Sequence, residues 1–204
     1  MLEELIIRTL CDTLPNTPVD GVYLFTQTED NQASSFAAAL QLITQGVIEK
    51  VCFIQTPAMS GYPGFAAWKE ELIKRGVPED TIAPVPPVPA DTDMLHTRIE
   101  AESIIHYAKL HGFKSILVTA PPFHQTRAFM AAVTATLSIY PALEVYSFPG
   151  EALPWQQAVA HSQGEVQDSR AGLIAGEVER IHKYQAKGDL AAVSEVLEYL
   201  NKRN

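Results

Sequence analysis

The chain has 204 residues, of which 47% are hydrophobic and 19% charged, and its formal net charge is −9. This length suits one sizeable hydrophobic core and is short for two, so we expect one domain over residues 1–204. The acidic balance excludes a broad nucleic-acid-binding surface, which needs a basic stripe, and no apolar run approaches the roughly 20 residues that cross a bilayer.

The N-terminal stretch MLEELIIRTLCDTL predicts an amphipathic helix, because its apolar residues recur at helical spacing. It carries acids early and lacks the basic start of a signal peptide. Neither Cys11 nor Cys52 lies near a second cysteine or a plausible set of metal ligands in the sequence. We therefore expect buried, reduced thiols, no metal site and a cytoplasmic protein.

Strand and helix patterns then alternate along the chain. Apolar, β-rich runs predict strands, and longer runs with helical spacing predict the helices between them. The third strand is expected to be short, because prolines cannot donate ladder hydrogen bonds. The predicted strands are 21–26, 50–56, a part of 81–89, 114–120 and 143–148, and the predicted helices are 34–46, 65–76, 94–111 and 124–140.

Such alternation is typical of an α/β fold. Strands that are apolar throughout are buried on both faces, which predicts a Rossmann-like parallel sheet of about five strands with helices on both faces. The expected order has the first strand in the middle. The sheet core spans about 21–148. The segment after 148 has few strand formers until a C-terminal helical hairpin at about 165–203, broken at Gly188.

The stretch LVTAPPFHQTRAF, residues 117–129, contains the leading candidate site. A strand ends at two prolines, and a helix then begins with His124 and Arg127 on one face. A helix N-terminus attracts anions, and Arg127 adds a fixed positive charge with bidentate geometry. We expect a small anionic ligand here. The competing interpretation is structural, with His124 capping the turn and Arg127 paired with an acid on a neighbouring helix.

Other candidates follow from the fold. Ligands of open parallel sheets bind at the carboxyl ends of the strands, which predicts Gln27, Thr56 and Thr119 as ligand-binding residues. Thr97 and Glu100 either form a capping box or lie at the same edge, with Thr97 binding ligand and Glu100 acting as a general base. The charged residues Arg170, Glu177 and Arg180 are expected to form an exposed or interdomain set.

The segment ILVTAPPFHQTRAF resembles the strand–turn–helix signature of the YdcF-like family (SanA/ElyC-type), a domain of unknown function. The resemblance covers about residues 21–148. It implies a Rossmann-like fold with a pocket at the strand ends and a small ligand. The residues that fit the family's elements are Val118, Thr119, His124, Arg127, Ala128, Thr97 and Glu100.

Three functions are compatible with these residues. The first is an enzyme or binding protein for a phosphate-bearing or nucleotide-like ligand. One version is a transferase that uses S-adenosylmethionine, with His124 or Glu100 as the catalytic acid–base group. The second is a non-catalytic ligand sensor or adaptor, since no nucleophile–base pair is visible. The third is a metal-dependent phosphohydrolase that uses Asp30, Asp91 or Asp93 with His124.

Overall fold

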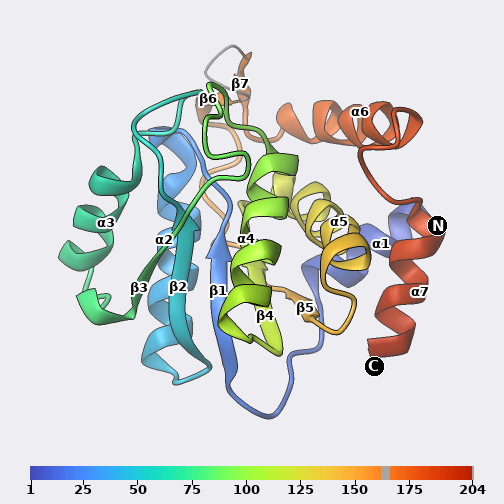
Figure 1. Cartoon of the computed structure of the whole chain (residues 1–204). Helices are drawn as coiled ribbons and strands as arrows, with labels where there is room; N and C mark the ends of the chain where they lie inside the picture. The colour runs from blue at the N-terminus through green and yellow to red at the C-terminus, as the bar shows by residue number, and fades with distance from the viewer. Residues whose placement is uncertain (162–165, 204) are drawn as a thin grey trace.

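A computed structural model of the protein describes residues 1–161 and 166–203. Five parallel strands form its main sheet in the order β3-β2-β1-β4-β5, which confirms the predicted Rossmann-like sheet with the first strand in the middle (Figure 1). The strand order reverses between β1 and β4, because β2 and β3 lie on one side of β1, and β4 and β5 lie on the other. The strands are β1 (Val19–Leu24), β2 (Ile48–Ile54), β3 (Ile82–Val85), β4 (Ser115–Thr119) and β5 (Glu144–Ser147).

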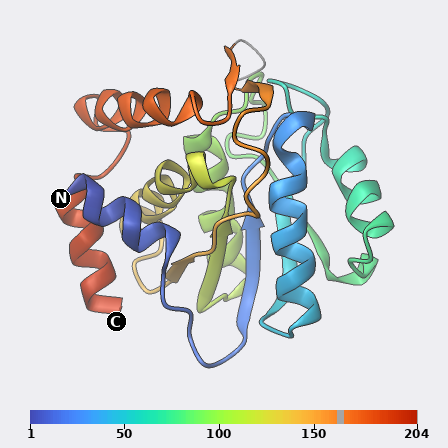
Figure 2. The same cartoon turned by 180° about the vertical axis from the view of Figure 1, so that it is seen from behind.

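Helices cover both faces of this sheet, as predicted. α2 and α3 pack on one face, α4 and α5 on the other, and α1 and α7 pack against α5 beyond it (Figures 1 and 2). The helices are α1 (Leu2–Leu10), α2 (Glu29–Thr44), α3 (Phe65–Lys74), the 3₁₀ turn η1 (Glu79–Thr81), α4 (Thr97–His111), α5 (Pro122–Ile139), α6 (Leu173–Ala186) and α7 (Val193–Arg203).

Alternate residues along each strand face opposite sides of the sheet, so the core has two parts, one on each face. Val22 and Leu24 of β1 face α2 and α3, whereas Tyr23 faces α4 and α5. On the α2–α3 face, the buried Trp68 packs edge-on against the ring of Tyr62, with 5.0 Å between the ring centroids. Tyr62 follows β2, so this contact joins the core to the loops at the carboxyl edge of the sheet.

Two local expectations are refined by the structure. β3 is short and contains Pro84, which is tolerated because β3 is an edge strand of the sheet. Cys52 is buried, and burial raises the pKa of its thiol to about 12. Cys11 is exposed, so the expected burial is wrong for that residue: it is the residue that ends α1, where the chain leaves the helix.

The C-terminal segment is helical, but its two helices do not lie side by side. α6 lies at the level of the carboxyl end of the sheet, runs outward over α5 and contacts it, whereas α7 runs along α1 and α5 (Figures 1 and 2). Gly188 separates them with a positive φ of 77°. Position 165, where the helical segment was expected to begin, lies outside the described residues, and α6 itself begins only at Leu173.

A short antiparallel pair, β6 (Ala158–His161) and β7 (Val166–Ser169), forms where the sequence predicts few strands. Contacts from the start of α2 hold it in place. The carbonyl of Ala160 accepts hydrogen bonds from Thr28 Oγ1 (2.8 Å) and Asn31 Nδ2 (3.1 Å), and its N–H donates to Asp30 Oδ2 (2.8 Å). Tertiary contacts rather than local propensity therefore specify β6.

This contact gives a first prediction. Asp30→Ala is expected to speed amide hydrogen exchange at Ala160, because the N–H of Ala160 loses its acceptor. The free energy of unfolding should fall by only about 1 kcal/mol, since the bond is exposed. Exchange measured by NMR checks this, with Glu29→Ala, the neighbouring exposed acid, as the control. Unchanged exchange at Ala160 in the Asp30 variant would show that β6 does not depend on this bond.

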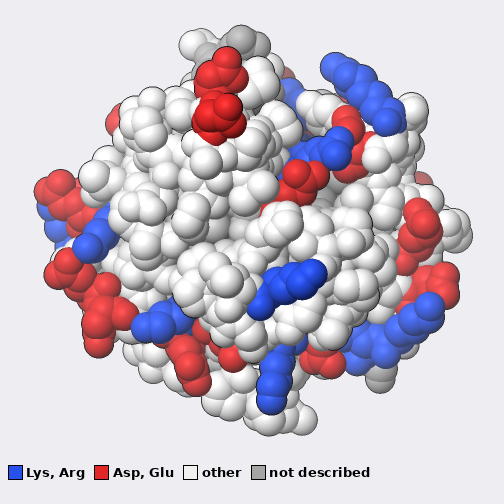
Figure 3. Space-filling view, in the orientation of Figure 1, with Lys and Arg blue, Asp and Glu red and all other residues white. Residues whose placement is uncertain are grey.

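In the described part of the chain, no helix combines the length and apolar character needed to cross a membrane. Acidic and basic side chains alternate over the face seen in Figure 3, separated by uncharged surface.

Candidate functional site

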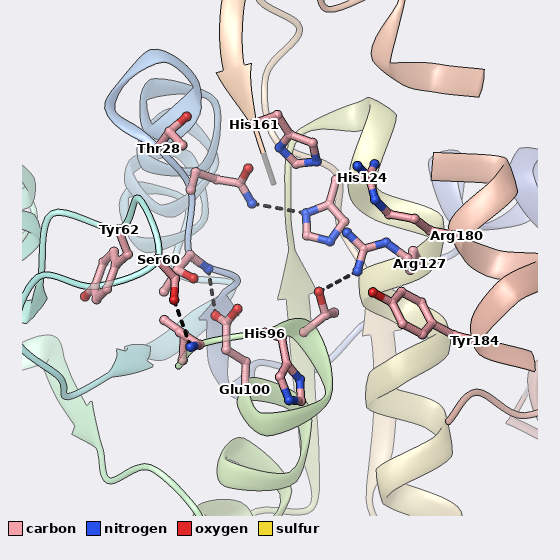
Figure 4. Close-up of a pocket in the computed structure, with 14 residues that line it drawn as sticks. Thr28, Ser60, Tyr62, His96, Glu100, His124, Arg127, His161, Arg180 and Tyr184 are labelled. Carbon is pink, nitrogen blue, oxygen red and sulfur yellow. Dashed lines mark hydrogen bonds between the residues drawn. The ribbon is translucent and has the colours of Figure 1, made fainter. Parts of the chain in front are cut away.

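A polar pocket of about 90 Å³ lies at the carboxyl end of the sheet, where β1 and β4 diverge (Figure 4). This is the switch point of the fold, at which open α/β sheets bind ligands. Segments from β1 to α6 contribute to its wall. The lining residues are Thr26, Gln27, Thr28, Ser60, Tyr62, Leu95, His96, Thr97, Glu100, His124, Arg127, His161, Arg180 and Tyr184.

Most of the predicted site residues meet in this pocket. Gln27, Thr97, Glu100, His124 and Arg127 all line it, although they come from the end of β1, from α4 and from α5. Three segments that are distant in sequence therefore share one small space.

Two predicted ligand-binding residues lie elsewhere. The hydroxyl of Thr119 donates to the carbonyl of Phe148 (2.7 Å), which ties β4 to the end of β5. Thr56 is buried, and its carbonyl accepts a hydrogen bond from the N–H of Phe65 (2.9 Å). Neither threonine lines the polar pocket: the hydroxyl of Thr119 is engaged by backbone, and that of Thr56 is buried without a partner among the described residues.

Glu100 is a buried acid whose partner is not the one that the capping-box pattern predicts. His96 caps α4, and its Nδ1 accepts from the N–H of Ile99 (3.4 Å). The Oε1 atom of Glu100 instead accepts from the N–H of Thr26 (2.7 Å), across the pocket floor. The side chain is 3% exposed, and burial raises its pKa to about 7, so it exchanges a proton near neutral pH.

His124 presents an unpaired N–H to the pocket. Gln27 Nε2 donates to Nδ1 of His124 (3.1 Å) and to the carbonyl of Phe25 (3.3 Å), which assigns the proton of His124 to Nε2. That Nε2 atom is buried without a partner among the described residues, and the ring points into the space above Glu100 (Figure 4). Burial, followed by the charge of Arg127, holds the pKa of His124 well below its usual value, so the imidazole is neutral.

Arg127 is engaged by an acid from α6, as the structural interpretation of the sequence expects. Its Nε donates to Glu177 Oε2 (2.6 Å), its Nη2 to Glu177 Oε1 (3.2 Å), and its Nη1 to Thr97 Oγ1 (2.6 Å). Glu177 also accepts from Arg180 Nη1 (2.9 Å) and His161 Nε2 (2.9 Å). Burial alone would raise the pKa of Glu177, but the charge of Arg127 holds it well below its usual value.

Some of the backbone N–H groups at the start of α5 are already hydrogen-bonded within the protein. The N–H groups of His124 and Gln125 both donate to the carbonyl of Pro121 (2.8 and 3.0 Å), and Pro122 has no N–H. The double proline thus fixes the turn, and the helix start offers the pocket an imidazole N–H in addition to its dipole.

The pocket carries one net positive charge when Glu100 is protonated, because Arg127 and Arg180 face the single carboxylate of Glu177. A guanidinium has five N–H groups, and Arg127 uses three of them in the bonds to Glu177 and Thr97. The other two have no partner among residues 1–161 and 166–203. The pocket therefore combines a weak positive potential with free N–H donors.

The residues that sequence reasoning misses come from the end of the chain. The sequence predicts an exposed or interdomain charge set that includes Arg170 and Glu177, but both are buried, at 3% and 2% exposure, so the exposed alternative is wrong for them. His161 and Tyr184 carry no signal in the sequence. The one usable signal is the spacing of Glu177 and Arg180, which places them on one face of a helix. Their partner, Arg127, lies 50 residues before Glu177.

Comparison of the chain with protein-family models, with curated proteins and with solved structures finds no match. Within the described residues, no group of three or more His, Cys, Asp or Glu is placed to hold a metal ion. Asp30, Asp91 and Asp93 do not line the pocket that holds His124.

Proposed function

We propose that the chain binds a small ligand with a phosphate-type anionic group in the polar pocket. The observation that carries this proposal is the N–H at Nε2 of His124, which is buried, aimed into the pocket and without a partner in the described part of the chain. An unsatisfied buried donor costs about 1–3 kcal/mol, and a ligand oxygen would remove that cost. The free N–H groups of Arg127 lie on the same wall.

Charge supports an anion of low valence. One net positive charge matches a singly charged group better than a multiply charged one. A nucleotide or an adenosyl compound such as S-adenosylmethionine, whose carboxylate is anionic, has the required polar head. The resemblance to the YdcF-like family implies a ligand of the same general class.

Glu100 favours an enzyme over a passive sensor. A carboxyl group with a pKa of about 7, buried beside a ligand pocket, is suited to general acid–base catalysis. In a transferase, Glu100 would take the proton from the acceptor group. The N–H groups of His124 and Arg127 would stabilise the negative charge on the bound ligand. A ligand sensor would use the same pocket without turnover.

A thermal-shift and calorimetry series with inorganic phosphate, AMP and S-adenosylmethionine tests the proposal. At least one probe should raise the melting temperature of the wild type. His124→Leu should weaken that binding about 10- to 100-fold, the equivalent of one hydrogen bond to a charged group. His182→Leu is the matched control, because His182 is exposed on α6.

Two results would contradict binding at this site. Either none of the three probes stabilises the wild type, or the His124 variant binds as tightly as the control. Turnover of the bound probe that is lost in Glu100→Gln without any loss of affinity would identify an enzyme, and binding without turnover would favour the sensor.

A further inference from the structure

A larger cavity of about 350 Å³ adjoins the polar pocket, between α4, α5 and the connection from α6 to α7. The two spaces share a wall made by His96, Thr97, Arg127 and Tyr184. In Figure 4 the side chains of Arg127 and Tyr184 lie next to each other on this shared side. The adjoining cavity therefore lies directly beside the place where the anionic group is proposed to bind.

The chemistry of the adjoining cavity differs from that of the polar pocket. Met94, Ala131 and Leu190 give it an apolar lining, and the ring of Tyr184 adds to that surface. Its charged residues are already paired, because Arg98 forms ion pairs with Asp189 and with Glu102. The cavity therefore offers apolar contact and no unpaired charge, which suits an uncharged group.

The polar pocket and the adjoining cavity differ in the size of the group that each can hold. The polar pocket, at about 90 Å³, holds several waters or one small polar group. Pockets that bind whole small molecules span roughly 300–1,000 Å³, a range that the adjoining cavity enters by itself. A ligand that fills both spaces needs a compact polar end and a bulkier apolar end.

We infer that the ligand is bipartite, with its anionic head at His124 and Arg127 and an uncharged, largely apolar group such as an aromatic ring in the adjoining cavity. This inference rests on the proposed function, because it assigns the rest of the ligand whose anionic head that function describes. Arg127 lies at the junction, so its two free N–H groups contact the head where the ligand passes from one space to the other.

Phenyl phosphate and methyl phosphate test the inference, because they share a head and differ in the apolar group. The wild type should bind phenyl phosphate about tenfold more tightly, as burial of a ring predicts. Ala131→Leu narrows the cavity of about 350 Å³ and should lower the affinity ratio. Met94→Ser should reduce the ratio about threefold. Neither variant should change the affinity for methyl phosphate.

Met94 is 48% exposed, so Met94→Ser keeps the test valid even if the core change at Ala131 disturbs folding. Ile7→Ser, which replaces an exposed apolar residue on α1, is the matched control and should keep the wild-type ratio. A ratio near one in the wild type, or an unchanged ratio in Met94→Ser, overturns the bipartite ligand while the proposed function stands. If the wild type binds neither ester, the inference is overturned, and the proposed function fails with it when inorganic phosphate, AMP and S-adenosylmethionine also do not bind.

Discussion

Glu177→Gln is expected to lower the free energy of unfolding by about 3–5 kcal/mol, because it leaves two guanidinium groups without their carboxylate. Glu177 is 2% exposed and accepts hydrogen bonds from Arg127, Arg180 and His161. The neutral amide keeps the size of the side chain but cannot balance the charge of Arg127, whose side chain is 10% exposed. Urea denaturation followed by circular dichroism measures the change.

The control for this variant is Glu179→Gln, an exposed acid on the same helix, which should change stability by less than about 0.5 kcal/mol. If Glu177→Gln is as stable as that control, the ion pairs around Glu177 contribute nothing to folding.

The effect of Glu177 should also depend on pH in a defined direction. Its pKa in the folded state lies well below the usual value, so its contribution is complete above the unfolded pKa of about 4.5. The contribution is lost as pH falls through the lower folded pKa. The difference in stability between the wild type and Glu177→Gln should therefore shrink in acid, and a difference that grows there would contradict the ion-pair explanation.

Glu100→Gln is expected to stabilise the protein at pH 8 by about 3 kcal/mol. The pKa of Glu100 rises from the ordinary glutamate value of 4.5 to about 7 in the fold, and each pH unit between these values is worth about 1.4 kcal/mol. Between pH 4.5 and 7 the folded state holds a proton that the unfolded state has lost, so wild-type stability falls as pH rises. Glutamine carries no such penalty and still accepts from the N–H of Thr26.

Chemical denaturation of wild type and Glu100→Gln from pH 4 to pH 8 tests this prediction. The two curves should separate progressively above pH 4.5 and run parallel above pH 7. Glu49→Gln, an exposed acid on β2, serves as the control and should follow the wild type. Parallel curves over the whole range would show that Glu100 ionises as freely in the fold as in the unfolded chain.

The protonation state of Glu100 should also affect the affinity for anionic ligands. Ionised Glu100 would cancel the single net positive charge of the polar pocket. Anions should therefore bind the wild type more weakly at pH 8 than at pH 6, and Glu100→Gln should reduce this dependence on pH.

The sheet is predictable from the sequence because its signals are local. Apolar runs such as those around Val22 and Leu117 can be satisfied only by burial on both faces, and the helices between them force parallel pairing. β6 escapes prediction because Asp30 and Asn31, far away in sequence, supply its hydrogen bonds. A strand held by such contacts has no local pattern to detect.

Some residues of the candidate site can likewise be predicted from the sequence, whereas others depend on distant contacts. His124 and Glu100 are found from the sequence because they follow or face strand ends, where topology brings them together. The role of Arg127 depends on Glu177, which is brought to it by the packing of α6 on α5. Thr97 and Glu100 match a capping box by spacing, but His96 caps the helix, and the carboxylate of Glu100 accepts from the amide of Thr26.

The packing of Trp68 on Tyr62 gives the molecule a built-in optical reporter. Tyr62 forms part of the pocket wall, and the indole of Trp68 lies directly behind it, shielded from solvent. The chain contains one other tryptophan, Trp155, which is partly exposed and lies away from the pocket. Replacing Trp155 with phenylalanine would leave a single emitting indole, so that occupation of the site is followed by intrinsic fluorescence without any attached dye.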